Sequence, residues 1–174
     1  MKAIIKIYFA LLIAVCCFFT AIAQTKSSKK AAKEAETAQL VEAKNYVFVA
    51  NYVNPFRGGG RSLTSEYDFT VTKDSLIAFL PYFGRAYLSD YGSIDNGIKF
   101  TSTQFDYQVT KDKKGGWDIF MAPKDANTTD ANAVKQLRLN ISADGYASLQ
   151  IISLNRDPIT FDGDIEKRES PKSL

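Results

Sequence analysis

The stretch with the greatest capacity for recognition chemistry is residues 80–87, LPYFGRAY, which closes a short apolar run. Arg85 lies there among Tyr82, Phe83 and Tyr87. A guanidinium carries a permanent charge and five hydrogen-bond donors in a planar fork, so it can bind a carboxylate or stack on an aromatic ring. Loops that only face solvent are made mostly of small polar residues. The composition of this stretch therefore predicts a site that holds an acidic group.

Arg85 has two interpretations, and under both its side chain is at least half buried and contacts Tyr82 or Tyr87. In the first, Arg85 is a structural clamp that ties the loop to the sheet through an internal carboxylate, because buried charges are nearly always paired. In the second, its guanidinium binds an acidic ligand at the mouth of a cavity. The internal carboxylates considered are those of Asp68, Asp106 and Asp118. The residues predicted to bind ligand are Tyr82, Arg85, Tyr87, Tyr91 and Arg156.

The composition excludes several kinds of catalysis. The sequence contains no His, and its two cysteines, Cys16 and Cys17, lie near the N-terminus. Zinc and copper sites built from Cys or His are excluded, as are Ser-His-Asp triads and Cys-His dyads. A hydrolase could still use a carboxylate or a Tyr, with Asp90, Asp95 or Tyr87 as candidates. We expect neither a metal nor a cofactor, since the acidic run DGDIE lacks the further acids of a calcium-binding EF-hand.

The N-terminus has the pattern of a secretory signal peptide. A basic start precedes an apolar run over residues 7–19, and an Ala-x-Ala site ends at Ala23. The apolar run is short for a transmembrane helix. The alternative is a lipoprotein signal that acylates Cys16 or Cys17, but neither follows the small residue that such a signal needs. We therefore expect cleavage after Ala23 and export to the periplasm or out of the cell.

The charge of the mature chain is nearly balanced. Two of the 22 basic residues, Lys2 and Lys6, lie in the predicted leader, which leaves the mature chain one positive charge above its 19 acidic residues. Binding to phosphate backbones needs a clustered excess of positive charge. The sequence therefore gives no reason to expect nucleic acid as a partner.

The chain begins with a helical pattern and then changes to strands. Residues 30–44 are rich in strong helix formers, and Ala31, Ala35, Ala38 and Val41 recur on one face. From Tyr46 the apolar residues alternate with period two, and both faces are apolar enough for a strand covered on both sides.

An internal repeat follows. Residues 67–74, YDFTVTKD, match residues 105–112, FDYQVTKD, and each is followed by a polar turn and a second strand that ends at a Pro. This order is typical of a β-hairpin. Val71 and Val109 are expected to be at least half buried on equivalent faces. The equivalent antiparallel hairpins are predicted over residues 63–80 and 101–122.

The remaining strands complete the predicted fold. Residues 137–151 alternate around a tight Asp-Gly turn, and residues 159–165 form a last strand. A change of parity predicts a bulge or break near Ser102. The fold class is α+β and mainly β, with an N-terminal helix followed by about eight antiparallel strands in hairpin or meander order. Such a sheet buries one face by curling into a sandwich or an open barrel.

Several segments together resemble the DUF4251 family of exported bacterial proteins. They are LPYFGRAY at 80–87, KGGW at 114–117, DGYA at 144–147 and NRDPI at 155–159. The resemblance covers roughly Val41 to Ile165. It implies export and a single domain, but no catalytic residue, because the family's name records an unknown function.

The predicted organisation has four parts. They are a signal peptide (1–23), a polar linker with the N-terminal helix (24–44), a single β-rich domain (45–165) and a flexible tail (166–174). We expect an exported envelope protein that is a non-catalytic binding module for a small ligand, a glycan or a partner protein. The alternatives are a carboxylate- or Tyr-based hydrolase and a purely structural envelope protein. The partner would be an unknown ligand or envelope protein, and the processed chain is expected to be a monomer that is not integral to a membrane.

Overall fold

The computed structural model describes residues 28–87, 97–125 and 133–168. The chain divides into two units, residues 1–36 and residues 37–174, and the second contains the whole sheet. The predicted signal peptide and Tyr91 lie outside the described residues. No helix within the described ranges is long and apolar enough to cross a membrane.

A helix over residues 28–43 is followed by ten antiparallel strands, which confirms the predicted mainly β class. The strands are β1 (Tyr46–Pro55), β2 (Arg61–Ser62), β3 (Asp68–Val71), β4 (Leu76–Leu80), β5 (Ile98–Ser102), β6 (Phe105–Lys111), β7 (Trp117–Pro123), β8 (Val134–Ile141), β9 (Tyr146–Ser153) and β10 (Ile159–Lys167). The count exceeds the predicted eight partly because β2 has only two residues, too few to show an alternating pattern.

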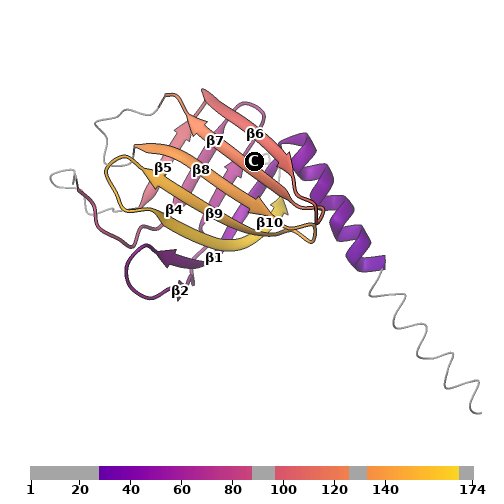
Figure 1. Ribbon diagram of the computed structural model, residues 1–174, viewed down its shortest axis with the longest axis horizontal. Coiled ribbons are helices and arrows are strands. Elements are labelled where there is room, and N and C mark those ends of the chain that lie inside the picture. The colour runs from indigo at the N-terminus through magenta and orange to yellow at the C-terminus, as the bar shows by residue number, and fades with distance from the viewer. Residues whose placement is uncertain (1–27, 88–96, 126–132, 169–174) are drawn as a thin grey trace, which may run out of the picture. The chain divides into compact units, whose positions relative to one another are not determined.

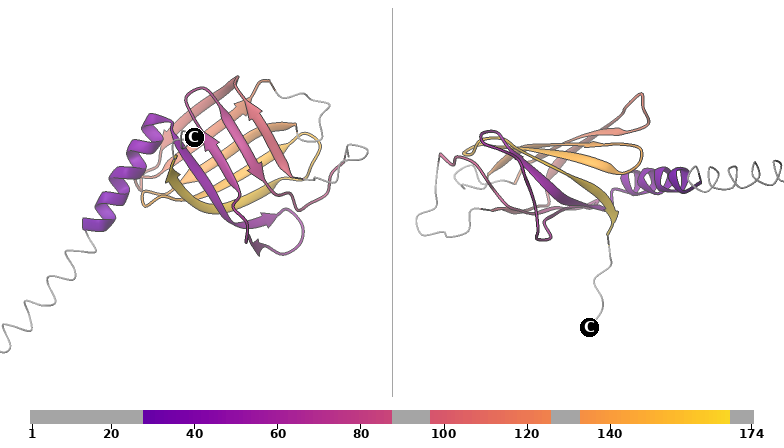
Figure 2. Two further views of the ribbon diagram at one scale, coloured as in Figure 1. Left: turned by 180° about the vertical axis from the view of Figure 1, so that it is seen from behind. Right: turned by 90° about the horizontal axis from the view of Figure 1, so that it is seen from below.

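The strands form one sheet in the order β5-β4-β3-β1-β10-β9-β8-β7-β6, with β2 paired to β1. The sheet curls into a nearly closed barrel. In Figure 1 strands β6–β10 lie in front of β1, β3 and β4, and Figure 2 shows the same two layers from behind and from below. β1 and β10, the first and last strands of the chain, pair with each other and join the two layers.

Alternate residues of each strand point into the barrel, as strand geometry requires. The largest side chains with less than 2% exposure are Tyr46, Phe48, Phe69, Phe161, Leu76, Leu80, Ile98, Met121, Leu137, Leu139, Leu149 and Ile151. The interior is therefore a packed apolar core, and polar groups concentrate on the outer face and at the barrel ends. β1 departs from the prediction, because its second face, with Val47 and Val49, is only partly covered.

The last helical turns belong to the same unit as the sheet, and Val41 is buried in its core. Lys44 directly follows the helix. Its φ of 49° is left-handed, and its N–H donates to the carbonyl of Val41 at 3.1 Å. The predicted apolar face is buried only at this end, since Ala31 and Ala35 are exposed.

Both predicted hairpins are present, as β3–β4 and β6–β7. They differ in burial, because Val71 is fully buried whereas Val109 is 45% exposed. The reason is position in the sheet. β3 has neighbours on both sides, while β6 is an end strand that pairs only with β7.

The predicted break near Ser102 is also present, since β5 ends at that residue and β6 begins at Phe105 without pairing to it. Asp125 holds this turn. It accepts hydrogen bonds from the Ser102 hydroxyl at 2.5 Å and from the Thr103 N–H at 2.7 Å. These bonds, the Ser102 one first, lower the pKa of the Asp125 carboxyl from its ordinary value.

The acidic run on β10 is bound to β1 by amide side chains. Asn54 donates to Asp162 at 2.8 Å, and Asn51 donates to Asp164 at 3.0 Å. Between them, Gly163 faces a bulge of β1, and a Cβ at this position would overlap the backbone carbonyl of Val49. The first and last strands, β1 and β10, are therefore held together by side-chain hydrogen bonds on the outer face and by a close backbone approach at Gly163.

Candidate functional site

The stretch that follows β4 lies beside the turn between β9 and β10. Ala86 and Arg156 form an isolated antiparallel bridge. Tyr87 N–H donates to the carbonyl of Asn155 at 2.8 Å, and Asp157 N–H donates to the carbonyl of Arg85 at 3.1 Å. Two segments that are about seventy residues apart in the chain are therefore fixed at one end of the barrel.

Tyr82 fastens this junction. Its hydroxyl lies 2.8 Å from the carbonyl oxygen of Arg85 and 3.2 Å from that of Asp157, so one proton is shared between two acceptors. Partial burial, followed by the nearby Asp157 charge, raises the pKa of the Tyr82 hydroxyl. Gly84 leaves room for it, because a Cβ there would come within 2.6 Å of the Tyr82 hydroxyl.

The arginine that is buried and bonded at this junction is Arg156, whereas the clamp interpretation of the sequence gave this role to Arg85. The side chain of Arg156 is only 6% exposed, its Nη1 donates to the carbonyl of Gly97 at 3.1 Å, and its guanidinium lies 4.8 Å from the ring centre of Tyr82. Arg85 belongs to the exposed residues, and its expected contact with Tyr82 or Tyr87 and burial of at least a half stay predictions. The main chain of Arg85 holds the junction, and its side chain lies outside it.

Asp157 brings charge to the same place. Its side chain is 7% exposed, its Oδ1 accepts from the Tyr87 hydroxyl at 2.6 Å, and its Oδ2 lies 3.7 Å from Nε of Arg57. The hydrogen bond to Asp157 is the main cause that raises the pKa of the Tyr87 hydroxyl. The positive charges of Arg57 and Arg85 lower the same pKa, but by less than the hydrogen bond raises it.

The side chains around this buried support are exposed. Tyr87 is 60% exposed, Phe56 is 66% exposed, and the side chain of Arg57 is 67% exposed. The guanidinium of Arg61 lies 4.5 Å from the ring centre of Phe83. We call Phe56, Arg57, Arg61, Phe83, Arg85 and Tyr87 the loop surface. It combines three cations with three aromatic rings on a support of hydrogen-bonded main chain.

The structure brings together four of the five residues predicted to bind ligand: Tyr82, Arg85, Tyr87 and Arg156. Tyr91 lies outside the described residues, as do the catalytic candidates Asp90 and Asp95. Asp68, Asp106 and Asp118 were considered as partners of Arg85. In the part of the chain that the structure describes, Asp106 pairs with Lys124 at 2.6 Å, and Asp68 accepts a hydrogen bond from the Thr70 hydroxyl at 3.1 Å.

Sequence reasoning missed Asp157 and Arg57 as members of the site. Neither is among the five residues that the sequence predicts to bind ligand. Asp157 lies in a turn, where an acidic side chain ordinarily faces solvent, so the sequence carried no signal for its burial. No local pattern could have connected Arg57 to it.

A second concave region was also missed. A groove of about 370 Å³ lies on the outer face of β6, β7 and β8, lined by Gln108, Thr110, Asp118, Ile119, Phe120, Arg138 and Asn140. The parity of the strands places Phe120 on the outer, polar face, and an aromatic residue out of phase with the core was the available signal.

The fold defines a class of antiparallel β protein. It is a nearly closed barrel with a packed interior, and its arginine and aromatic side chains gather on the loops at one end. The profile described as "Domain of unknown function (DUF4251)" matches residues 28–165, so the chain belongs to the DUF4251 family. A crystal structure of a DUF4251 family protein from Bacteroides eggerthii DSM 20697 is similar, with 19% sequence identity and a TM-score of 0.60. The alignment covers 80% of this chain and 91% of that one. None of the curated proteins compared with this chain matches it.

Proposed function

We propose that this protein is an exported, non-catalytic binding module whose loop surface holds an acidic group of a ligand or partner. The supporting observation is that exposed Arg57 and the Tyr87 hydroxyl both contact buried Asp157, beside the main chain of exposed Arg85. A rigid support below exposed cations lowers the entropy lost when a ligand is bound. The predicted signal peptide supports export, and the fold, with its filled barrel, leaves recognition to the surface.

The directions of the pKa shifts favour binding over catalysis at these residues. A nucleophilic or basic tyrosine needs a lowered pKa, whereas the hydrogen bond to Asp157 raises that of Tyr87. The pKa of the Asp125 carboxyl is lowered, so this group is held in its ionised form and is not a proton donor at neutral pH.

The test is a titration of the mature protein with oligoglutamate, followed by amide chemical shifts. We expect shifts at residues 56–61 and 82–87, and a dissociation constant that rises with salt because exposed charges are screened. Arg57→Ala and Arg85→Ala should each weaken binding, by about tenfold or less for a single exposed contact. Lys73→Ala, which removes an exposed cation at the turn after β3, is the matched control and should leave binding unchanged.

Native mass spectrometry of protein purified from its own host would identify any ligand that stays bound to it. An acidic ligand supports the proposal. Binding of oligoglutamate that is equal in the Arg57→Ala, Arg85→Ala and Lys73→Ala variants would show that the loop surface is not the site.

A further inference from the structure

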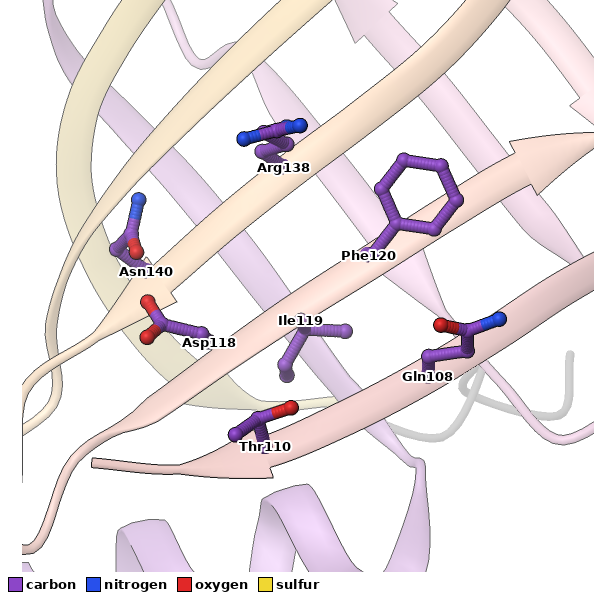
Figure 3. Close-up of a pocket in the computed structure, with 7 residues that line it drawn as sticks. All are labelled: Gln108, Thr110, Asp118, Ile119, Phe120, Arg138 and Asn140. Atoms are coloured by element: carbon purple, nitrogen blue, oxygen red, sulfur yellow. The ribbon is translucent and has the colours of Figure 1, made fainter.

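We propose that the outer face of β6–β9 is a second binding site, built for an uncharged oligosaccharide. This site shares no residue with the loop surface. Its first part is the groove of about 370 Å³ on β6–β8 (Figure 3), and its second is an adjoining groove of about 280 Å³. Both are lined by Asp118 and Asn140, so they are continuous through these two residues. Each volume is near the low end of the range of about 300–1,000 Å³ for small-molecule sites.

The strand register arranges the polar side chains in two rows. Gln108 lies opposite Phe120, which lies opposite Arg138. Thr110 lies opposite Asp118, which lies opposite Asn140. Figure 3 shows these side chains on one face of three neighbouring strands, with the Phe120 ring beside the polar groups. The result is a surface that presents an aromatic ring together with an amide, a carboxylate, a guanidinium and a hydroxyl.

The polar groups of this face are not used to hold the barrel together. Within the described ranges, no side-chain hydrogen bond or ion pair engages Asp118, Arg138 or Asn140. The same residue types on β1 and β10 are paired, since Asn54 donates to Asp162 at 2.8 Å and Asn51 to Asp164 at 3.0 Å. Asp118 and Asn140 are direct cross-strand partners, yet a groove lies where their bond could form.

The chemistry of the lining fits sugar hydroxyls. A carboxylate accepts, a guanidinium donates and an amide does both, so together they can satisfy neighbouring hydroxyls in fixed orientations. Phe120 offers a flat apolar face to the C–H side of a sugar ring, as pockets for small ligands commonly combine aromatic surface with a few placed polar groups. In the first groove Asp118 and Arg138 cancel in charge, which favours a neutral ligand there, and in the second groove Asp112 adds a carboxylate, which disfavours an anion.

The second groove adds another ring and extends the site. It is lined by Tyr146, which is 52% exposed, as well as by Ser142 and Ser148. The register places Tyr146 two strands across and four residues along from Phe120. Strand spacing and rise make their Cα separation roughly 17 Å. A ligand that contacts both rings must be a chain of several sugar units rather than one.

The test titrates the mature protein with cellohexaose, xylohexaose, mannohexaose and maltohexaose, followed by amide chemical shifts. We expect at least one to bind with a dissociation constant in the millimolar range or tighter and to shift amides of β6–β9, with no dependence on salt. Phe120→Ala and Tyr146→Ala should each weaken binding about tenfold or more. Asp118→Asn, which keeps the side-chain volume, should weaken it as well.

Phe79→Ala is the matched control, because Phe79 is also an exposed aromatic residue, 44% exposed, on the outer face of β4. It should leave hexaose binding unchanged. Failure of every hexaose to bind in the millimolar range would overturn the proposal. So would equal binding by the Phe120→Ala, Tyr146→Ala and Phe79→Ala variants, or a preference for hexagalacturonate that falls with salt. The outcome is independent of oligoglutamate binding at the loop surface, which shifts a different set of amides.

Discussion

Two arginines in neighbouring segments illustrate how burial divides structural from surface roles. Arg156 is enclosed at the junction of the β4–β5 and β9–β10 connections, whereas Arg85 contributes its main chain there and exposes its side chain. The sequence around Arg85 indicated the junction, and the arginine whose buried guanidinium lies there is Arg156. A residue's burial depends on which segment faces it, and that segment here is about seventy residues away.

Replacing each arginine by Ala should separate these roles. Arg156→Ala removes a buried guanidinium that donates to the Gly97 carbonyl, and should lower the free energy of unfolding by roughly 2–3 kcal/mol. Arg85→Ala should change it by less than about 0.5 kcal/mol, as an exposed substitution does. Urea unfolding of both variants gives the answer. Equal losses would mean that Arg85 is a clamp after all.

Tyr82 offers a milder change at the same junction. Tyr82→Phe removes the hydroxyl that bridges the carbonyls of Arg85 and Asp157, and should cost about 1 kcal/mol. Tyr146→Phe is the control, because Tyr146 is half exposed on β9 and no described hydrogen bond of its hydroxyl would be lost. A stability unchanged by Tyr82→Phe would show that the bridge is replaced by water.

At the scale of elements, the seam between β1 and β10 depends on one glycine. A Cβ on residue 163 would overlap the Val49 carbonyl, and this atom belongs to backbone that cannot rotate away. Gly163→Ala should therefore cost about 3 kcal/mol, at the upper end for an added methyl group in a packed site. Thermal unfolding tests this, with Gly59→Ala as control, since a Cβ at Gly59 has nothing within 4 Å.

The two hairpins should respond unequally to truncation. Val71→Ala creates a cavity in the core and should cost roughly 1–3 kcal/mol, whereas Val109→Ala on the end strand should cost less than about 1 kcal/mol. Chemical unfolding of the two variants compares them directly. Equal losses would mean that β6 is covered in solution by a partner or by part of the chain outside the described ranges.

The elements were the most predictable level of this protein. Period-two alternation located β1, β3, β4 and β6–β10, because inward positions must be apolar wherever one face is buried. β2 and the single-residue bridge at Ala86 have no such period. Part of the site was predictable, because local composition indicated residues 80–87. The ion pair of Arg57 with Asp157 was not, because it joins segments a hundred residues apart. Nothing in either segment specifies the other.

At the scale of the whole molecule, the absence of His and the state of the tyrosines predict the dependence of stability on pH. The described tyrosines with raised pKa values are Tyr46, Tyr82, Tyr87, Tyr107 and Tyr146. A group with a raised pKa in the folded state contributes stability that is present below its unfolded pKa and lost as the pH rises through the folded value. Stability should therefore fall above a pH of about 10.

The acid side depends on carboxyl groups. The pKa of the Asp125 carboxyl is lowered in the folded state. Its contribution to stability is therefore present above the pKa of the unfolded state and is lost as the pH falls through the pKa of the folded state. Between about pH 5 and 9 the midpoint of urea unfolding should be nearly constant, since no histidine is present to titrate. A Ser102→Ala variant should reduce only the acid-side dependence. A marked change of the midpoint near neutral pH would contradict this account.

The strand order has a consequence for how the chain folds. Residues 46–102 and 105–167 each form a contiguous run of neighbouring strands. Among the described strands, the pairing of β1 with β10, with Tyr46 opposite Lys167, is the only ladder between the two runs. Proteins rich in local contacts fold fastest, so this long-range pairing should be the slow, final closure. A circular permutant that joins residue 168 to residue 37 by a flexible linker and opens between Thr103 and Gln104 would make that pairing local. It would keep every strand ladder, and stopped-flow measurement should find that it folds faster than the natural chain order.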